Sequence, residues 1–454
     1  MSKTNRRNFL KTTAAAGAGV IIAKDLLANE SPNEKIAYAA VGVGGKGTSD
    51  ASEAANHGEV VAICDTNRNQ LAAGLARFEN AKAYEDYRVM FDEMGDKIDA
   101  FTVSTADHMH GIISARGMKM GKHVYTQKPM ARTIYETRRL TEIAREKKVI
   151  TQMGNQGSGG PTFRETVQMI RAGMLGDVSD VYLWTDRPVW PQGNPRPTEP
   201  RDIPEYLNWD LWLGVAPHRP YYPGQYDPFA WRGWWDFGTG ALGDNACHSM
   251  NLPFRALGLT NPGWVQAKTS GHDHDYFPKW SLIEYFFPAT DARPAVRFHW
   301  MDGGQRPANS RDLIGDERPG NFGCVIVGSR GRWFSREDYG DDQATFFGFS
   351  NDEVRAWKDK VTYPRCPGFF TEFANAIKAN DPSLCSSSFP EQAGPLTEMV
   401  LMGNLAVWGA WKPEEEGPRV EWDVNSMSIT NNPEDKARLE SLVRPTFREG
   451  YEMF

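Results

Sequence analysis

Short apolar runs alternate with longer amphipathic stretches over the first third of the chain. Strand-length runs are expected at residues 36–43, 60–64, 99–104, 122–126 and 149–152. Helical spacing lies between them, most clearly over 134–147. Strands that alternate with helices predict a parallel, doubly wound sheet. Ligands of such sheets bind beyond the carboxyl ends of the strands.

From about residue 154 the pattern changes. A helix near 162–172 precedes a strand at 177–184, and later alternating runs lie at 264–269, 280–287, 295–301 and 323–327. These runs predict mainly antiparallel strands. Helices near 370–379 and 392–409 close the region, and a polar tail follows. We therefore predict an α/β protein in which an N-terminal parallel sheet precedes a C-terminal α+β domain with a large, mainly antiparallel open sheet.

A glycine-rich loop directly follows the first predicted strand, with the sequence Gly42-Val43-Gly44-Gly45-Lys46-Gly47. Strand, loop and a following helical stretch form the context in which this spacing binds a dinucleotide. Gly42 permits a tight turn, Gly44 lets the backbone approach a pyrophosphate, and Gly47 allows close helix–strand contact. The helix N-terminus offers N–H groups and a positive dipole end to the phosphates. We predict that these glycines, with Gly45, hold the cofactor.

Asp65 ends the second predicted strand, ~20 residues beyond the glycines, where a carboxylate accepts hydrogen bonds from a ribose 2′-OH. A 2′-phosphate would meet a like charge there, so Asp65 favours NAD over NADP, and nearby Arg68 weakens that preference. The alternative role of Asp65 is a cap on the next helix. Thr105, His110 and Lys128 stand at later strand ends and complete the predicted cofactor-binding set.

The first 30 residues are typical of an export signal. Lys3, Arg6 and Arg7 form a basic region before a mild, Ala/Gly-rich apolar stretch at 12–23. Paired arginines followed by Phe-Leu-Lys indicate twin-arginine export, and a chance arginine pair is the alternative. We expect a periplasmic or secreted protein. No apolar run of about 18 residues follows, so no membrane span is expected in the mature chain.

The bulk composition is that of an ordinary globular protein, with 24% charged and 40% hydrophobic residues. A net charge of -7 argues against a nucleic-acid partner. The run His272-Asp273-His274-Asp275 looks like a metal cluster. Neighbouring strand residues point to opposite faces, however, and no further Cys or His stands at metal-ligand spacing. We expect a solvated loop there and no metal.

Taken in order, these features resemble the Gfo/Idh/MocA oxidoreductases. Beyond the glycine loop and Asp65, the matching motifs are Ser104-Thr105-x-Asp107-His108-x-His110, Gln127-Lys128-Pro129, Gly154-Asn155-Gln156, Gly173-x-x-Gly176-Asp177-Val178 and Gly243-Asp244-Asn245-Ala246-Cys247-His248. With the leader, the chain looks like the secreted, sugar-directed branch of that family.

The resemblance implies an NAD-binding Rossmann domain at 34–153 and a substrate-binding α/β domain at 154–430, with a C-terminal tail at 431–454. In that family the second sheet often forms an oligomer interface, so a homo-oligomer is expected. The resemblance also implies that Lys128, Asp244 and His248 are the catalytic positions. The family strand usually ends in Glu-Lys-Pro. Gln127 therefore removes a negative charge beside Lys128.

The spacing of Asp244 and His248 is i and i+4, which places them on one face of a helix. Histidine suits proton transfer near neutrality, and a carboxylate can hold it in one tautomer. We predict that His248 is the general base, that Asp244 orients it or binds substrate, and that Lys128 polarises the reacting oxygen. From spacing alone, an inconsequential surface pair is the stronger interpretation; the glycine-flanked setting and the resemblance reverse it.

Seven tryptophans and many prolines crowd the segment from residue 184 to 235. Aromatic rings pack on the C–H faces of sugars, while Arg and Asp bind hydroxyls. Ordinary burial explains most tryptophans equally well. The candidates for the substrate pocket are Arg187, Trp190, Tyr222, Trp235 and Asp236.

The predicted function is oxidation of a secondary hydroxyl of a sugar or glycoside by tightly bound NAD, since folded export would carry the cofactor out. The first alternative is an NAD-dependent glycosidase that oxidises transiently, eliminates the aglycone, adds water and re-reduces the sugar. The second is a secreted sugar-binding protein without catalysis.

Overall fold

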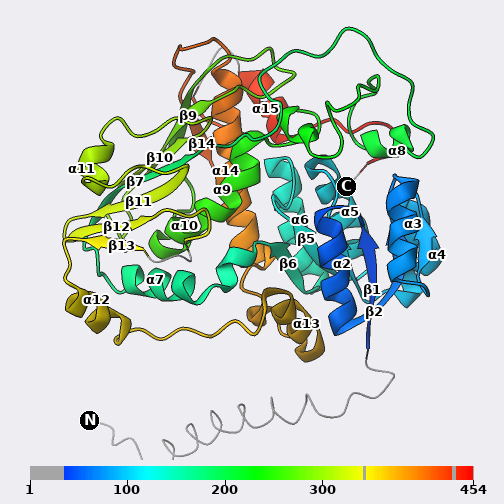
Figure 1. Ribbon diagram of the computed structural model, residues 1–454, viewed down its shortest axis with the longest axis horizontal. Helices are drawn as coiled ribbons and strands as arrows, with labels where there is room; N and C mark the ends of the chain where they lie inside the picture. The colour runs from blue at the N-terminus through cyan, green and yellow to red at the C-terminus, as the bar shows by residue number, and fades with distance from the viewer. Residues whose placement is uncertain (1–34, 341–343, 432–435, 453–454) are drawn as a thin grey trace, which may run out of the picture.

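The computed structural model describes residues 35–340, 344–431 and 436–452 and contains two large sheets (Figure 1). The first sheet has six parallel strands in the order β3-β2-β1-β4-β5-β6. Its strands are β1 (Ile36–Val41), β2 (Gly58–Cys64), β3 (Lys82–Tyr84), β4 (Ala100–Val103), β5 (His123–Gln127) and β6 (Thr151–Gly154). The doubly wound N-terminal sheet is thereby confirmed.

Helices cross between these strands, as the alternating pattern predicted. They are α2 (Lys46–His57), α3 (Arg68–Arg77), α4 (Tyr87–Met94), α5 (Asp107–Lys119) and α6 (Ile134–Lys147). Thr133 begins α6 with a capping box, in which its side chain and that of Glu136 bond reciprocally to the backbone. The segment 105–110 is a loop only up to Ala106. Asp107 already begins α5, where its negative charge suits the positive end of the helix.

The second sheet has nine strands in the order β13-β12-β11-β7-β10-β9-β8-β14-β15. Its strands are β7 (Val178–Thr185), β8 (Trp264–Thr269), β9 (Ser281–Phe287), β10 (Val296–Met301), β11 (Phe322–Gly328), β12 (Gly331–Ser335), β13 (Thr345–Phe347), β14 (Val420–Asp423) and β15 (Ser428–Ile429). Every pair is antiparallel except β7 with β10. The predicted, mainly antiparallel sheet is confirmed, and the pattern analysis missed only its short outer strands, β12 to β15.

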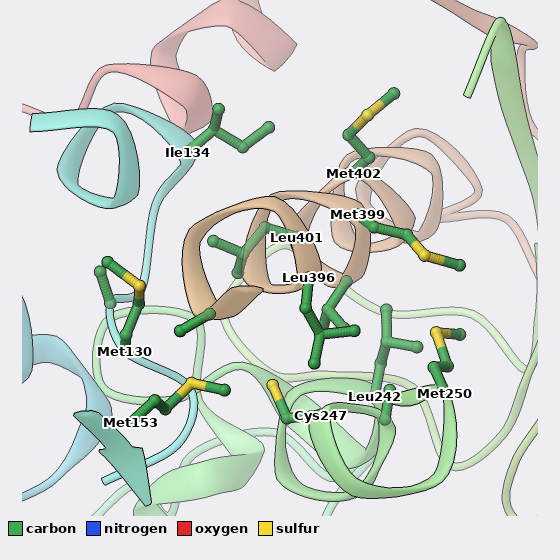
Figure 2. Packing of buried hydrophobic residues seen from close by; sticks show 14 of the residues in the cluster. Met130, Ile134, Met153, Leu242, Cys247, Met250, Leu396, Met399, Leu401 and Met402 are labelled. Carbon is green, nitrogen blue, oxygen red and sulfur yellow. The ribbon is translucent and has the colours of Figure 1, made fainter. Parts of the chain in front are cut away.

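One long buried helix, α14 (Gly394–Gly409), fills the space between the second sheet and the first domain, where it contacts α6, α9 and β8 (Figure 1). The helix has buried residues, mostly apolar or small, on every face, as expected of a helix with no solvent-facing stripe. Figure 2 shows Leu396 and Met399 of α14 facing Leu242, Cys247 and Met250, and the sulfur-rich contact continues to Met130 and Met153. This shared core ties the two domains together.

The remaining helices cover the second sheet and the domain junction. They are α7 (Pro161–Arg171), α8 (Trp209–Leu213), α9 (Gly240–Ser249), α10 (Asn251–Leu257), α11 (Ser310–Ile314), α12 (Asn351–Lys358), α13 (Phe369–Ala379) and α15 (Lys436–Val443). Although α13 comes late in the chain, its Phe370 packs on Tyr38 and Tyr125 of the first sheet.

The C-terminal stretch also returns to the first domain. Tyr451 is buried, and the Arg88 guanidinium lies 4.5 Å from its ring centroid. Arg448 forms a 2.6 Å ion pair with Asp210. The segment after residue 430, which was expected to be a polar tail, therefore contains the helix α15. This helix packs on α14 and contacts β15. The predicted export signal lies outside the described residues, and within them no helix is long and apolar enough to cross a membrane.

Candidate active site

A cavity of about 660 Å³ lies between the carboxyl ends of the first sheet and the second domain. The glycine loop and Asp65 line one end, and α9 with Lys128 lines the other. Residues from several other stretches beyond the first domain also reach it, among them Arg187, Arg232 and Asp338. Its position agrees with the expectation for ligands of a doubly wound sheet.

The glycine loop has the geometry that its sequence predicted. Gly42 has φ +79°, and a Cβ there would lie 2.6 Å from the Ser104 carbonyl oxygen. A Cβ on Gly47 would lie 1.9 Å from the Gly42 carbonyl oxygen, so only glycine permits this approach of helix and strand. Gly45 caps α2 without any side-chain hydrogen bond. The Gly47 and Thr48 N–H groups of the first turn donate to the Gly44 and Gly45 carbonyl oxygens, so the positive end of the helix dipole and the N–H groups that precede them face a phosphate.

Asp65 lines the cavity at the end of β2, as predicted. Its two carboxylate oxygens accept backbone hydrogen bonds from Val43 and Asn67, each at 2.9 Å. Burial raises the pKa of Asp65, and those backbone hydrogen bonds oppose the rise. Each oxygen keeps a further lone pair for a ribose hydroxyl. The carboxylate thus braces the loop as well as facing the cofactor space.

Arg68 begins α3 but does not line the cavity. Its guanidinium donates to Glu85 at 2.7 Å instead. Because Glu85 already neutralises this arginine, Arg68 gives little support to a 2′-phosphate, and the preference for NAD becomes sharper.

Gln127, which departs from the family pattern, has a specific partner. Its side-chain amide donates to the carboxylate of Asp50 on α2 at 2.8 Å, and both residues are buried. Asp50 also accepts a 2.8 Å hydrogen bond from Ser104 and pairs with Lys46. A glutamate at position 127 would put two carboxylates in contact. The negative charge expected at 127 is therefore present nearby, on Asp50.

Thr105 and His110 line the middle of the cavity. The ring nitrogens of His110 lie 2.7 Å from the Pro129 carbonyl oxygen and 3.0 Å from that of Thr105. The ring is thus fixed in the wall between β4 and β5. This placement suits the predicted role of shaping the cofactor side of the cavity.

The helix α9 presents two different faces. Leu242, Cys247 and Met250 point into the core against α14 (Figure 2). Asp244 and His248 lie on the opposite face and line the cavity, as the i, i+4 spacing predicted.

Asp244 is surrounded by positive charge. Its Oδ1 lies 2.9 Å from the Lys128 Nζ and 2.8 Å from the Arg232 Nε, and its Oδ2 lies 3.9 Å from the Arg187 Nε. Burial alone would raise the pKa of Asp244, but the charges of Lys128 and Arg232 outweigh it and hold that pKa well below its usual range. Asp244 is therefore a permanent anion that positions cations.

His248 is held by Asn155 and not by Asp244. The Asn155 amide donates to the Cys247 carbonyl oxygen at 2.7 Å, which turns its Oδ1 toward the His248 Nδ1 at 3.1 Å. Nδ1 must then carry the proton, and Nε2 keeps a lone pair. Burial, helped by the Lys128 charge, lowers the pKa of His248 to about 3. The imidazole is therefore neutral near pH 7, with a free lone pair on Nε2, and the same burial makes it a weaker base than an exposed histidine.

Two further groups at this end were not singled out from the sequence. The Asp338 carboxylate accepts a hydrogen bond from Asn245, and burial raises its pKa to about 6. The Tyr339 ring packs edge-on against His248 at 4.7 Å between centroids. They follow β12, a strand that the pattern analysis missed, so no local signal marked them.

The tryptophan-rich segment mostly forms core, and of its five predicted pocket residues only Arg187 lines the cavity. Trp235 stacks on Phe277 at 3.7 Å, and Asp236 pairs with Arg219. Tyr222 and Trp190 are also buried outside the lining. Burial of large aromatic area explains these positions.

The histidine–aspartate run at 272–275 is a loop, as expected, but it is only partly solvated, because Asp273 is exposed and His272 is not. His272 is buried, and its Nε2 donates to the Val407 carbonyl oxygen at 2.9 Å. Across the described parts of the chain, no three His, Cys, Asp or Glu side chains are arranged to hold a metal.

The cavity fits a dinucleotide at its first-domain end. The uncapped α2 N-terminus would receive the pyrophosphate, Asp65 a ribose, and the His110 wall the nicotinamide. Comparison with protein families agrees: a model for the Gfo/Idh/MocA family, NAD-binding Rossmann fold, matches residues 36–155. The model for that family's C-terminal alpha/beta domain matches residues 166–291. The chain belongs to the Gfo/Idh/MocA oxidoreductase family.

The family assignment confirms the resemblance and the predicted cofactor NAD. A twin-arginine signal model matches residues 3–23, which indicates export. The match to the family's C-terminal domain includes β7, β8 and β9 of the second sheet together with α9. Lys128, Asp244 and His248 meet where α9 reaches the Rossmann strands.

Curated relatives act in carbohydrate chemistry by name. A glycosyl hydrolase family 109 protein from Solibacter usitatus is 30% identical over 200 residues, which are 39% of this chain and 45% of that protein. A levoglucosan dehydrogenase from Pseudarthrobacter phenanthrenivorans is 22% identical over 214 residues, 45% of each chain. The chain thus spans about half the length of the curated relatives it matches.

Solved structures share the fold over a longer stretch. The WlbA dehydrogenase from Bordetella pertussis, in complex with NADH and UDP-GlcNAcA, aligns with a TM-score of 0.59 at 15% identity, covering 86% of this chain and 100% of that one. A levoglucosan dehydrogenase bound to NADH and levoglucosan aligns with a TM-score of 0.55 at 16% identity, covering 84% and 98%.

Proposed function

We propose that the protein is an NAD-dependent oxidoreductase that oxidises a secondary hydroxyl of a sugar or glycoside. The observation that carries the proposal is the neutral His248, whose Nε2 is left to accept a proton beside the Lys128 ammonium. Both groups lie in the same cavity as the glycine loop. The named relatives that handle sugars support this substrate class.

In the proposed mechanism, His248 Nε2 removes the hydroxyl proton as the alkoxide develops. The Lys128 ammonium stabilises that negative charge in a largely buried site. Bound NAD supplies the hydride acceptor. Asn155 keeps the imidazole in the tautomer that can act as a base. Asp244 fixes Lys128 and Arg232, so its role is to position charge.

A redox-neutral glycosidase is the second candidate, and Asp338 with Tyr339 favours it. After oxidation, the C–H next to the new carbonyl becomes acidic. A second acid–base group must remove that proton before the aglycone leaves, after which water adds and the carbonyl is reduced again. Tyr339 packs against His248, and Asp338, with a pKa of about 6, lines the same cavity beside Asn245. The glycosyl hydrolase family 109 relative supports this alternative.

Export sets a further demand on the cofactor. A twin-arginine route carries folded proteins, so we propose that NAD is bound tightly before transport and acts in the periplasm or outside the cell. A homo-oligomer remains our prediction for the second sheet.

A glycoside panel tests these proposals on the purified protein. Acid release should yield nicotinamide dinucleotide in stoichiometric amounts. A keto-sugar product supports the dehydrogenase, free sugar with aglycone supports the glycosidase, and saturable binding without turnover would overturn both. His218→Asn, at an exposed histidine, is the matched control for His248→Asn.

A further inference from the structure

Among the described cations that line the cavity, Arg187 is the one whose side chain donates no hydrogen bond. Lys128 and Arg232 both donate hydrogen bonds to Asp244. The Arg187 Nε lies 3.9 Å from the other oxygen of Asp244, an ion-pair distance that is too long for a hydrogen bond. Its Nε is buried and makes no hydrogen bond. A buried guanidinium donor without an acceptor is costly, so a ligand is the natural source of one.

The chemistry of Arg187 points to a particular acceptor. A guanidinium presents a planar fork of N–H donors that matches the two oxygens of a carboxylate. Asp244 already receives two cations, and no other described carboxylate lies within ion-pair distance of Arg187. Hydroxyl groups can also accept from the fork, but they bring no negative charge to the guanidinium, and charge-assisted hydrogen bonds are the stronger ones.

The surroundings also limit how much negative charge a ligand can bring. Asp338 and Asp244 both lie close enough to act electrostatically on this end of the cavity. A phosphate dianion would meet those carboxylates, whereas a carboxylate brings a single charge to the free guanidinium.

We propose that the substrate is an acidic sugar, such as a uronic acid or its glycoside, whose carboxylate is bound by Arg187. This inference rests on the proposed function and narrows it. The carboxylate lies on the Arg187 side of Asp244, and the reacting hydroxyl lies between Lys128 and His248. Arg187 acts in substrate binding and holds no proton that the reaction transfers.

Matched sugars test the proposal by titration calorimetry on the NAD-loaded protein. Each neutral hexose of gluco, galacto and manno configuration is compared with its uronic acid and its 6-phosphate. In at least one configuration, the acid should bind about 10- to 100-fold tighter than the neutral sugar. Equal affinities in every configuration, or a stronger phosphate, would overturn the inference.

Arginine variants link the preference to this side chain. Arg187→Gln should remove most of the acid-to-neutral ratio, and Arg187→Lys, which keeps the charge but loses the fork, should retain an intermediate ratio. The control is Arg201→Gln, at an exposed arginine of the same segment outside the cavity lining. Thermal unfolding of each variant checks that it is folded. An unchanged ratio in folded Arg187→Gln would sink the proposal.

Turnover, measured separately as reduced nicotinamide or released aglycone, distinguishes the two ideas. Tight binding of an acid without any chemistry contradicts the proposed function and leaves the binding inference standing. If neutral sugars are turned over as fast as their acids, the proposed function stands and the inference about an acidic substrate is contradicted.

Discussion

The two ends of the cavity are built in different ways. At the cofactor end, the ligand-facing groups are mainly backbone: a glycine loop, an uncapped helix N-terminus and strand ends within the first 130 residues. At the substrate end they are charged side chains from segments far apart in the chain, including Lys128, Arg187, Asp244 and Asp338. The first end repeats a local motif, whereas the second exists only when both domains are folded together.

This contrast explains which substitutions should be specific. Changes at the substrate end should alter chemistry or selectivity and leave NAD bound, because Asp65 and the glycine loop are held by their own hydrogen bonds. Substitutions of residues that pack behind the cofactor end should mainly lower the free energy of unfolding, because that end is formed by closely packed backbone.

The largest expected effect is loss of the base. His248→Asn should lower kcat by about 10²- to 10⁴-fold, because a positioned proton acceptor disappears. Nicotinamide released by acid should stay stoichiometric. The measurement is steady-state turnover beside the His218→Asn control. Turnover near the normal rate would remove His248 from this role.

The positioning of that base gives the next effect. Asn155→Ala should lower kcat by about 10²-fold, because the imidazole loses its fixed tautomer and orientation. Substrate KM should change far less, and Asn155→Gln should recover part of kcat if its longer amide reaches Nδ1. A parallel loss of kcat, KM and bound cofactor would instead indicate a purely structural residue.

The Gln127–Asp50 pair tests the cofactor end through stability. Gln127→Glu should destabilise the fold by about 1–3 kcal/mol, because two buried carboxylates would replace a hydrogen bond. Adding Asp50→Asn restores one acid and one amide and should recover most of the loss. Denaturant unfolding of the four-member mutant cycle measures the coupling, and additive losses would contradict the pairing.

The smallest expected effect concerns pH. Below a pKa of about 6, Asp338 gains a proton and loses its charge, while His248, with a pKa of about 3, stays neutral. A substrate carboxylate remains ionised above about pH 4.5. Binding of an acidic sugar should therefore strengthen roughly 5-fold from pH 7 to pH 5, the effect of removing one like charge in a water-like dielectric.

The other charged neighbours of Asp338 bear on this test. Arg187, Asp244 and Lys128 act electrostatically on Asp338. Asp244 stays ionised throughout the experiment, because its pKa lies well below the interval from pH 5 to pH 7. Calorimetry of the Asp338→Asn variant isolates the group, since its pH dependence should be flat. The same slope in that variant would assign the effect elsewhere.

Much of the fold could be predicted because its signals are local. The strand–glycine–helix pattern and the i, i+4 spacing on α9 required only neighbouring residues, and both were found where expected. The prediction of pocket residues in the tryptophan-rich segment was mostly wrong, because a tryptophan suits a core and a sugar pocket equally well. Trp235, for example, packs in the core. Asp338 carried no signal, since it follows a short strand and meets its hydrogen-bond partner, Asn245 of α9, only in the folded chain.

By itself the sequence determined the doubly wound sheet, the glycine loop and the polar face of α9, because backbone conformation and helical periodicity are set within a few residues. Only the tertiary structure decided that Asp244 anchors cations and that Asn155, which directly follows β6, orients His248. It also decided that the Arg187 Nε finds no hydrogen-bond acceptor within the described parts of the chain. These outcomes depend on burial and on which charges meet across the domain junction, and long-range contacts of that kind leave no mark in the local pattern.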